Sequence, residues 1–292
     1  MSRSSIREAF RTNPRLRVGG LLAVFVAAGV LFSLLDISLV RAATAAISVH
    51  RLTSANTSVP GADPFSPLWK AAPPADIPLS AQQMYQPGGG GSVQSVQVRA
   101  LQDGEQIAFL VSWADTTRND YVKDMPSDAA AIQLPIEPDH LPYQCMGQSD
   151  SRVNIWQWKA ALEQVAIAAH EPNNGTRNLT SNGICKAVDT EGIIPTATSA
   201  WRDGRWYVVY QRRLAPSDLG TAPLMPGEPT NAAFAIWDGG KGETRGMKSV
   251  STWIPVEINA GEEDGASGLI TLALAGLAGA GVVALAWRLI PH

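Results

Sequence analysis

The sequence predicts a mainly β protein: an antiparallel β-sandwich domain with few short helices, flanked by hydrophobic helices at both ends. Three observations lead to this expectation. Short runs alternate between apolar and polar residues, Asp-Gly dipeptides interrupt several of these runs, and an apolar segment lies near each end of the chain. Alternation with a period of two is typical of half-buried strands, and many short strands separated by turn residues are typical of sandwiches.

Three strand pairs are expected, at 93–113, at 200–210, and at 232–237 with 248–258. In the first pair, apolar residues alternate on both sides of Asp103-Gly104, a dipeptide that often forms the turn of a hairpin. The second pair repeats this pattern around Asp203-Gly204. One short helix is expected at 156–169, lying over a sheet.

The domain organisation follows from changes in composition. Residues 54–91 are dense in Pro, Gly and Ser, and 88–91 are four consecutive glycines, which is typical of an extended, loop-like segment. The expected organisation is an Arg-rich start with a hydrophobic helix at 1–40, a Pro/Gly-rich arm at 41–92, a β-sandwich domain at 93–259 and a C-terminal hydrophobic helix at 266–290.

Both apolar segments are long enough to span a membrane. Residues 18–35 are apolar or small without interruption, close to the ~20 residues that a helix needs to cross a bilayer core. Residues 266–287 carry no charge before Arg288, and their small residues recur at a four-residue spacing that lets helices approach closely. We therefore expect two transmembrane helices in contact with membrane lipid.

The charges at the start of the chain predict its orientation. Five arginines lie in the first 17 residues, and positively charged flanks tend to stay in the cytoplasm. Residues 41–265 are then expected on the periplasmic, extracytoplasmic face of the cytoplasmic membrane. The first segment has an alternative interpretation as a cleaved signal peptide, because Ala43-Thr44-Ala45 resembles a cleavage site and Asp36 is unfavourable in a membrane helix. Both interpretations export the middle domain.

An exported domain lies in an oxidising compartment. Two cysteines there more often form a disulfide than remain free, so a Cys145–Cys185 disulfide is expected. Two cysteines are too few for an iron–sulfur cluster, and the four histidines lack the spacing of a zinc site. The net charge of −3 gives no reason to expect a nucleic-acid partner. No nucleophile, phosphate-loop or dinucleotide motif is present, so no residue is assigned a catalytic role.

Three blocks, in this order, resemble the cytochrome gamma subunits of the ethylbenzene dehydrogenase type, which accompany molybdenum enzymes of the dimethyl sulfoxide reductase family. The blocks are VQVRAL at 96–101 with SWADTT at 112–117, MG at 146–147 with VNIWQWKA at 153–160, and AFAIWDG within 233–239 with KSVSTW at 248–253. The resemblance covers about 93–258, and the order and spacing of the blocks carry it. It implies an open β-sandwich that holds one haem b and passes electrons.

The resemblance also implies that a methionine and a lysine bind the haem iron. Met146 matches the methionine, and the polar turn around it is a poor place for its plainer interpretation as core filler. Lys248 is the first choice for the lysine and Lys241 is the second, against the plainer interpretation of an exposed, solvated side chain. A lysine binds iron only as a neutral amine, which costs about 4.6 kcal/mol at pH 7, whereas methionine is a soft ligand that raises the haem potential.

The partners that the resemblance implies are an iron–sulfur beta subunit and a molybdenum catalytic alpha subunit, as in complexes of the nitrite oxidoreductase or nitrate reductase type. A further membrane subunit or a cytochrome c is compatible with this arrangement. Asp115, Asp128 and Arg99 are candidates for positioning haem propionates, against their plainer interpretation as turn or surface residues.

The alternative function is a binding or anchoring module without haem. In that reading the sandwich binds carbohydrate on exposed tryptophans, or only tethers a catalytic subunit. The tryptophans that would serve as such a platform are Trp69, Trp156 and Trp201.

Overall fold

The computed structural model describes residues 46–261, except 54–56, 62, 85, 121–125, 143–145, 171–174, 217 and 219. The hydrophobic helices predicted within 1–40 and 266–290 lie outside the described residues, as does Cys145. Among the described residues, the structure contains no helix that combines the length and the apolar character needed to cross a membrane.

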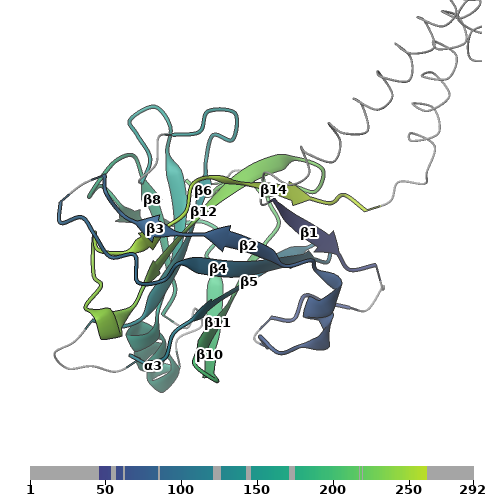
Figure 1. The fold of residues 1–292 in the computed structure, drawn as a ribbon. Helices are drawn as coiled ribbons and strands as arrows, with labels where there is room; N and C mark the ends of the chain where they lie inside the picture. Colours follow the sequence, from purple (N-terminus) through teal and green to yellow (C-terminus); the bar gives the residue numbers. More distant parts are fainter. Residues whose placement is uncertain are drawn as a thin grey trace, which may run out of the picture. The chain divides into compact units, whose positions relative to one another are not determined.

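The described chain is built mainly from strands (Figure 1). The strands are β1 (Ile47–Arg51), β2 (Ala75–Pro78), β3 (Ser80–Ala81), β4 (Ser95–Gln102), β5 (Gln106–Ala114), β6 (Ala129–Pro135), β7 (Val153–Lys159), β8 (Arg177–Ser181), β9 (Val188–Asp189), β10 (Thr196–Arg202), β11 (Arg205–Arg213), β12 (Pro229–Trp237), β13 (Ser249–Val250) and β14 (Ile254–Ile258). The helical elements are the 3-10 turns η1 (Pro67–Ala71) and η2 (Gly239–Lys241) and the helix α3 (Ala160–Ala169).

Eleven of these strands form one hydrogen-bonded path in the order β10-β11-β5-β4-β1-β14-β12-β6-β7-β8-β9, while β2, β3 and β13 pair off this path. The predicted mainly β class is therefore confirmed. The prediction of purely antiparallel pairing is wrong, because β1 pairs in parallel with both β4 and β14. Strand β1 lies outside the alternating segments on which the sandwich was predicted, so that pattern carried no information about its direction.

Strand β12 joins the two halves of this path. Its first part, up to Ala232, pairs with β14, whereas its second part, from Ala233, pairs with β6. The two halves pack face to face through a shared apolar core. Across that core the rings of Phe109 and Trp156 lie 6.1 Å apart, and the Tyr210 hydroxyl donates to the Ala130 carbonyl at 2.8 Å. The single path thus folds over on itself as a sandwich does.

The predicted strand pairs at 93–113 and 200–210 are confirmed as β4-β5 and β10-β11, whose turns contain Asp103-Gly104 and Asp203-Gly204. The helix predicted at 156–169 is wrong in its first part, since 153–159 form β7 and α3 begins only at Ala160. Trp156 and Trp158 are fully buried at alternate positions of β7, so both point to the same face of the strand.

The arm predicted at 41–92 contains regular structure. Strand β2 pairs with β4, and β3 pairs with β13. Within η1, Trp69 is 4 % exposed and donates from its ring nitrogen to the Asp63 carbonyl at 3.0 Å. Segments of this arm are thus held against the sheet by strand pairing and by one buried tryptophan.

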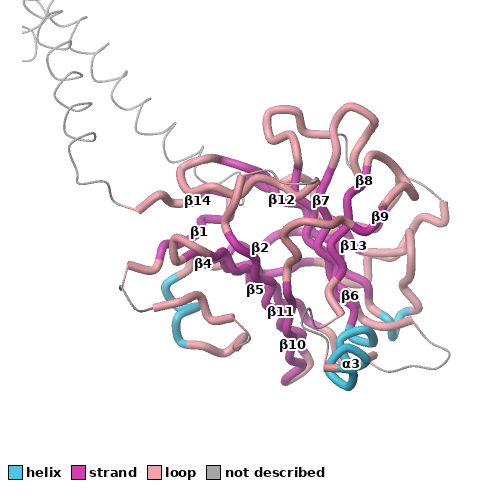
Figure 2. The backbone as a smooth tube through the Cα atoms, turned by 180° about the vertical axis from the view of Figure 1, so that it is seen from behind, coloured by secondary structure: helices cyan, strands magenta, loops and turns pink. Residues whose placement is uncertain are grey.

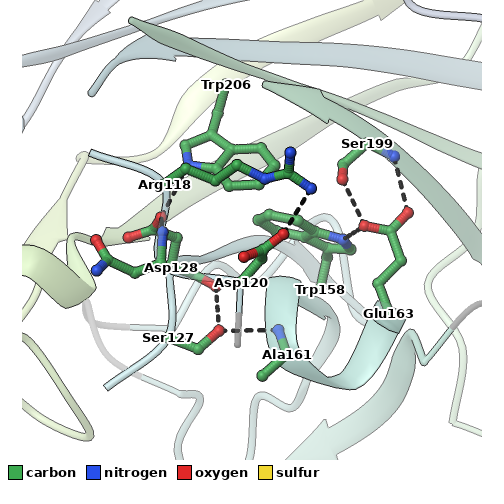
Figure 3. A network of polar contacts seen from close by, with 10 residues as sticks. Arg118, Asp120, Ser127, Asp128, Trp158, Ala161, Glu163, Ser199 and Trp206 are labelled. Atoms are coloured by element: carbon green, nitrogen blue, oxygen red, sulfur yellow. Dashed lines mark hydrogen bonds and ion pairs between the residues drawn. The ribbon is translucent and has the colours of Figure 1, made fainter. Parts of the chain in front are cut away.

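Buried polar contacts fix α3 and the strand ends beside it (Figure 3). The Glu163 carboxylate, 2 % exposed, accepts from the Trp158 ring nitrogen at 2.8 Å and from the backbone and hydroxyl of Ser199. Asp128 accepts from the Trp206 ring nitrogen at 2.9 Å. Figure 2 shows α3 beside the ends of β6 and β10, as the contact from Glu163 on α3 to Ser199 on β10 requires.

Candidate functional site

A cavity of about 970 Å³ lies over one face of β6, β7, β8, β12 and β13. Small side chains leave this space open. Ala131, Ala233 and Ala235 alternate along β6 and β12 on the cavity face, while Ile132 and Ile236 between them point into the core. The period-two alternation of a strand thus separates a bulky core face from a shallow, hollowed face.

Met146 lines the cavity, packs partly buried against the apolar cluster below it, and donates from its backbone N–H to the Gln133 side chain at 3.1 Å. Its φ of +62° is left-handed, which is unfavourable for a residue with a Cβ. Gly147 follows with φ +81°, and a Cβ there would lie 2.6 Å from the Ser181 carbonyl oxygen. The Met-Gly pair is thus a tight turn that places Met146 near Gln133.

Lys248 also lines the cavity, at the start of β13. Its Nζ lies 4.9 Å from the centroid of the Trp237 ring, which lines the same cavity. Its backbone is bound on both sides: the N–H donates to the Gly89 carbonyl at 3.1 Å, and the carbonyl accepts from the Gln82 N–H at 3.0 Å. A Cβ on Gly90 would lie 2.3 Å from the Lys248 nitrogen, so the glycine run at 88–91 is what lets the arm pack against Lys248.

Met146 and Lys248 belong to opposite ends of the cavity floor. Gln133, bound by Met146, pairs with Ala233, whereas Ala129 at the other end of β6 pairs with Trp237, beside Lys248. Four residues of strand separate the two levels, which corresponds to about 13 Å. Side chains from the two ends can therefore reach toward a group held between them.

Lys241, the second choice for the lysine, is not among the described residues that line the cavity. It is exposed at the end of η2, and its charge lowers the pKa of the Asp115 carboxyl, where burial has the opposite and larger effect. The structure thus brings Met146 and Lys248 to one cavity and leaves Lys241 near a different group of residues.

Sequence reasoning missed a third lysine. Lys159 lines the cavity at the level of Trp237, since it pairs with Ala129. Burial, and then the charge of Arg177, lower the pKa of its amine. The signal was present in the sequence, because Ile155, Gln157 and Lys159 alternate with buried Trp156 and Trp158 and so share the opposite face of β7.

The cavity wall is positively charged. Of the described lining residues, the basic ones are Lys159, Arg177, Arg245 and Lys248, and the acidic one is Glu243. Arg177 is paired with Asp189 at 3.0 Å, and Glu243 accepts backbone N–H groups from Ser92 and Asp238. The wall therefore suits a large ligand that is apolar in its body and anionic at its edge.

The remaining candidates lie elsewhere or are only partly described. Arg99 donates to the carbonyls of Trp69 and Ala72. Arg99, Asp115 and Asp128 are not among the described residues that line the cavity. Cys185 lines the cavity as an exposed thiol. Because Cys145 lies outside the described residues, the disulfide between them stays a prediction.

The tryptophans of the alternative carbohydrate site are mostly buried. Trp156 is fully buried and Trp69 is 4 % exposed, while Trp201 packs partly buried against the core. The expectation that these three side chains form an exposed platform is wrong, because Trp156 and Trp201 pack in or against the main core and Trp69 packs in a second apolar cluster between the arm and the sheet.

The fold and the cavity together define a β-sheet domain that can hold a large ligand between two ends of one sheet face. The profile of the ethylbenzene dehydrogenase family matches residues 66–193 and 195–249. The chain belongs to this family, and the resemblance seen in its sequence blocks is confirmed.

Three curated relatives agree with this assignment. The chain is 30 % identical over 222 residues to a protein of Haloferax mediterranei named as a respiratory nitrate reductase heme subunit, covering 75 % of this chain and 76 % of the relative. It is 29 % identical to the chlorate reductase subunit gamma of Ideonella dechloratans, covering 66 % of this chain and 79 % of the relative. It is 27 % identical to the dimethylsulfide dehydrogenase subunit gamma of Rhodovulum sulfidophilum, covering 66 % and 73 %.

Among solved structures, a family 9 carbohydrate-binding module from Caldicellulosiruptor kristjanssonii matches with a TM-score of 0.40 and 10 % identity, covering 75 % of this chain and 97 % of that one. A similarity of this size supports no inference about function.

Proposed function

We propose that this chain is an electron-relay cytochrome subunit that holds one haem b in the cavity above β6 and β12, with Met146 and Lys248 as the axial ligands of the iron. The observation that carries the proposal is that both residues line one cavity from opposite ends of its floor. The relative named as a heme subunit supports the choice of ligand.

The cavity fits the group in size and chemistry. Its volume of about 970 Å³ lies near the upper limit of the roughly 300–1,000 Å³ typical of small-molecule and cofactor sites. The alanines of β6 and β12 and the rings of Trp237 and Trp253 offer apolar contacts to the body of a porphyrin. Haem b, when bound, would supply one-electron transfer.

The two ligands have different requirements on this chain. The Met146 sulfur is neutral and needs only to be held in place, which the Met-Gly turn and the bond to Gln133 achieve. Lys248 would have to give up its proton to bind the iron, and Lys159 and Arg245 lie on the same cavity wall. Their charges are available to the haem propionates, so Lys159 and Arg245 are the proposed propionate-binding side chains.

Occupation of both axial positions by protein side chains would leave no coordination site for oxygen or peroxide. This favours electron transfer over catalysis. The proposed partners are an iron–sulfur subunit and a molybdenum catalytic subunit, in line with the gamma subunits among the relatives. We propose further that the domain lies on the extracytoplasmic face of the cytoplasmic membrane, anchored by the apolar segments at 18–35 and 266–287.

The test is optical. Full-length protein produced with added haem should show b-type, low-spin absorbance in a reduced-minus-oxidised spectrum. Met146→Ala and Lys248→Ala should each convert the spectrum to a high-spin or mixed form, because one axial position is vacated. Lys241→Ala is the matched control for removal of a lysine outside the cavity, and its spectrum should match that of the wild type.

A second variant tests the cavity without touching either ligand. Ala235→Phe adds a ring to the cavity floor, so it should reduce haem content while leaving the folded domain intact, as judged by circular dichroism. Absence of b-type absorbance in wild-type protein supplied with haem would refute the proposal.

A further inference from the structure

Three buried aspartates meet beyond the end of the cavity. Asp115 follows β5, Asp128 precedes β6, and Asp238 follows β12. A carboxylate oxygen from each lies within 4.8 Å of the others. The residues are 5 %, 0 % and 8 % exposed, so three acidic groups share one site that is almost closed to solvent.

Hydrogen-bond donors of the protein reach only some of the carboxylate oxygens of these three aspartates. Asp128 accepts from the backbone N–H groups of Asn119 and Gly239 and from the Trp206 ring. Asp238 accepts from the backbone of Lys241 at 3.1 Å. Asp115 accepts from Thr117 through Oδ1, but its buried Oδ2 has no hydrogen-bond partner in the described part of the chain. A buried carboxylate oxygen without a donor costs free energy and calls for a cation or a proton.

Further oxygens converge on the same place. A Cβ built on Gly240 would lie 2.6 Å from the Thr117 hydroxyl oxygen, 3.0 Å from the Asn119 side-chain oxygen and 3.2 Å from Oδ1 of Asp238. These three oxygens therefore lie within 3.2 Å of one point, and the Thr117 hydroxyl also donates to Oδ1 of Asp115 at 3.0 Å and to Oδ1 of Asn119 at 2.9 Å. The absence of a side chain on Gly240 leaves that point accessible to them.

Without a cation the cluster is electrostatically unfavourable. Burial, together with the charge of Asp238, raises the pKa of Asp115, and burial with the charge of Asp115 raises the pKa of Asp128 to about 6. Lys241 partly offsets this charge at Asp115. One lysine at an exposed position does not balance three carboxylates.

We propose that Asp115, Asp128 and Asp238 bind one calcium ion, with the oxygens of Thr117 and Asn119 as further ligands. The donors are all oxygens, which selects a hard cation. Calcium suits the site because it accepts irregular sets of carboxylate, amide and hydroxyl oxygens, whereas Mg²⁺ requires near-ideal octahedral geometry and retains its waters.

The ion would join both halves of the sheet, since Asp115 lies at the end of β5 and the other two aspartates at the ends of β6 and β12. Ser127 and Ala129, on either side of Asp128, line the cavity, and so does Trp237, which directly precedes Asp238. Calcium would therefore stiffen the end of the cavity that holds Lys248.

The experiment uses full-length, haem-supplied protein treated with a chelator and desalted. Addition of CaCl2 at about 100-fold over the dissociation constant should raise the melting temperature by roughly 5–10 °C. MgCl2 at the same concentration should raise it much less. Calorimetric titration with CaCl2 should show one site per chain.

Asp115→Asn separates a calcium site from a merely buried cluster. Because it removes an unpaired negative charge, this variant should fold at least as well as the wild type in chelator, but it should lose the response to calcium. Asp139→Asn, at an exposed position outside the cluster, is the matched control and should keep the full response.

Terbium gives an independent readout. The Trp206 ring donates a hydrogen bond to Asp128, so it lies close enough to sensitise the luminescence of a bound lanthanide. Tb³⁺ luminescence should appear in the wild type, fall when CaCl2 is added, and be absent from Asp115→Asn. If calcium leaves the melting temperature and the titration heat unchanged in chelator-treated wild type, the aspartates share protons instead and the proposal is wrong.

Discussion

The Nζ atom of Lys248 lies 4.9 Å from the centroid of the Trp237 ring, and both side chains line the cavity. A lysine over an indole face is stabilised in its charged form by about 0.5–2 kcal/mol. Binding to iron requires the neutral form, so the ring and the proposed ligand role compete. As the proposed ligand, Lys248 would have to be neutral and would lose the stabilisation that the Trp237 ring gives its charged form.

The first prediction distinguishes the two lysines of the cavity. Lys248→Met should change the haem spectrum from low-spin to another form, whereas Lys159→Met should keep the low-spin spectrum and weaken haem binding about tenfold through loss of a charge near the propionates. Titration of the two variants with haem, followed optically, measures both effects. If instead Lys159→Met changed the low-spin spectrum and Lys248→Met kept it, Lys159, whose pKa burial lowers, would be the iron ligand.

The second prediction concerns the glycine run. Gly90→Ala should destabilise the protein by about 2–4 kcal/mol, because a Cβ would lie 2.3 Å from the Lys248 nitrogen and φ is +86°. Gly89→Ala is the matched control: φ is +109° but nothing lies within 4 Å, so only the backbone strain of about 1–2 kcal/mol is expected. Urea unfolding measures both. Equal losses would show that the contact with Lys248 has no energetic role.

A third prediction concerns pH. Burial raises the pKa of Asp128 from 3.8 to about 6, so the folded protein holds this proton more tightly than the unfolded chain. Stability from this group is present below pH about 4 and is lost as the pH rises through 6, by up to about 3 kcal/mol. The Asp115→Asn variant removes a negative charge that raises the pKa of Asp128. In chelator, the free energy of unfolding of the wild type, measured relative to this variant, should therefore fall as the pH rises from 4 to 7. A difference that rises with pH would contradict the raised pKa.

The fourth prediction concerns the attachment of α3. Glu163→Gln should lower the free energy of unfolding by about 1–3 kcal/mol, because the amide turns an N–H group toward donors that need an acceptor, namely the Trp158 ring nitrogen and Ser199. Glu191→Gln, at an exposed position, should have little effect. Chemical denaturation measures the difference, and the haem spectrum should be the same in both variants, since neither residue lines the cavity.

Several elements could be predicted from local sequence because their signal is local. The turns at 103–104 and 203–204 join strands of opposite direction, as the Asp-Gly dipeptides predicted. The helix boundary at 159–160 could not be predicted in this way. The tryptophans of β7 are compatible with either period until their partners, Phe109 and Trp113, are known.

The candidate site likewise contains residues that the sequence could indicate and residues whose placement depends on the tertiary structure. Met146 and Lys248 were candidates from the sequence blocks, because a family resemblance is a property of order and spacing. That Lys248 lines the cavity depends on pairing between Ile236 and Ser249, whereas Lys241 ends a 3-10 turn and is not among the described lining residues. Pairing of β7 with β6 likewise places Lys159 at the cavity.

By itself the sequence determined the mainly β class, the hairpin turns and the family, since these depend on side-chain period, turn chemistry and motif order along the chain. Only the tertiary structure decided which side chains meet. The parallel placement of β1, the packing of the glycine run against Lys248 and the convergence of Asp115, Asp128 and Asp238 all join residues far apart in sequence. Such contacts depend on how the sheet folds over on itself, and no local pattern encodes that geometry.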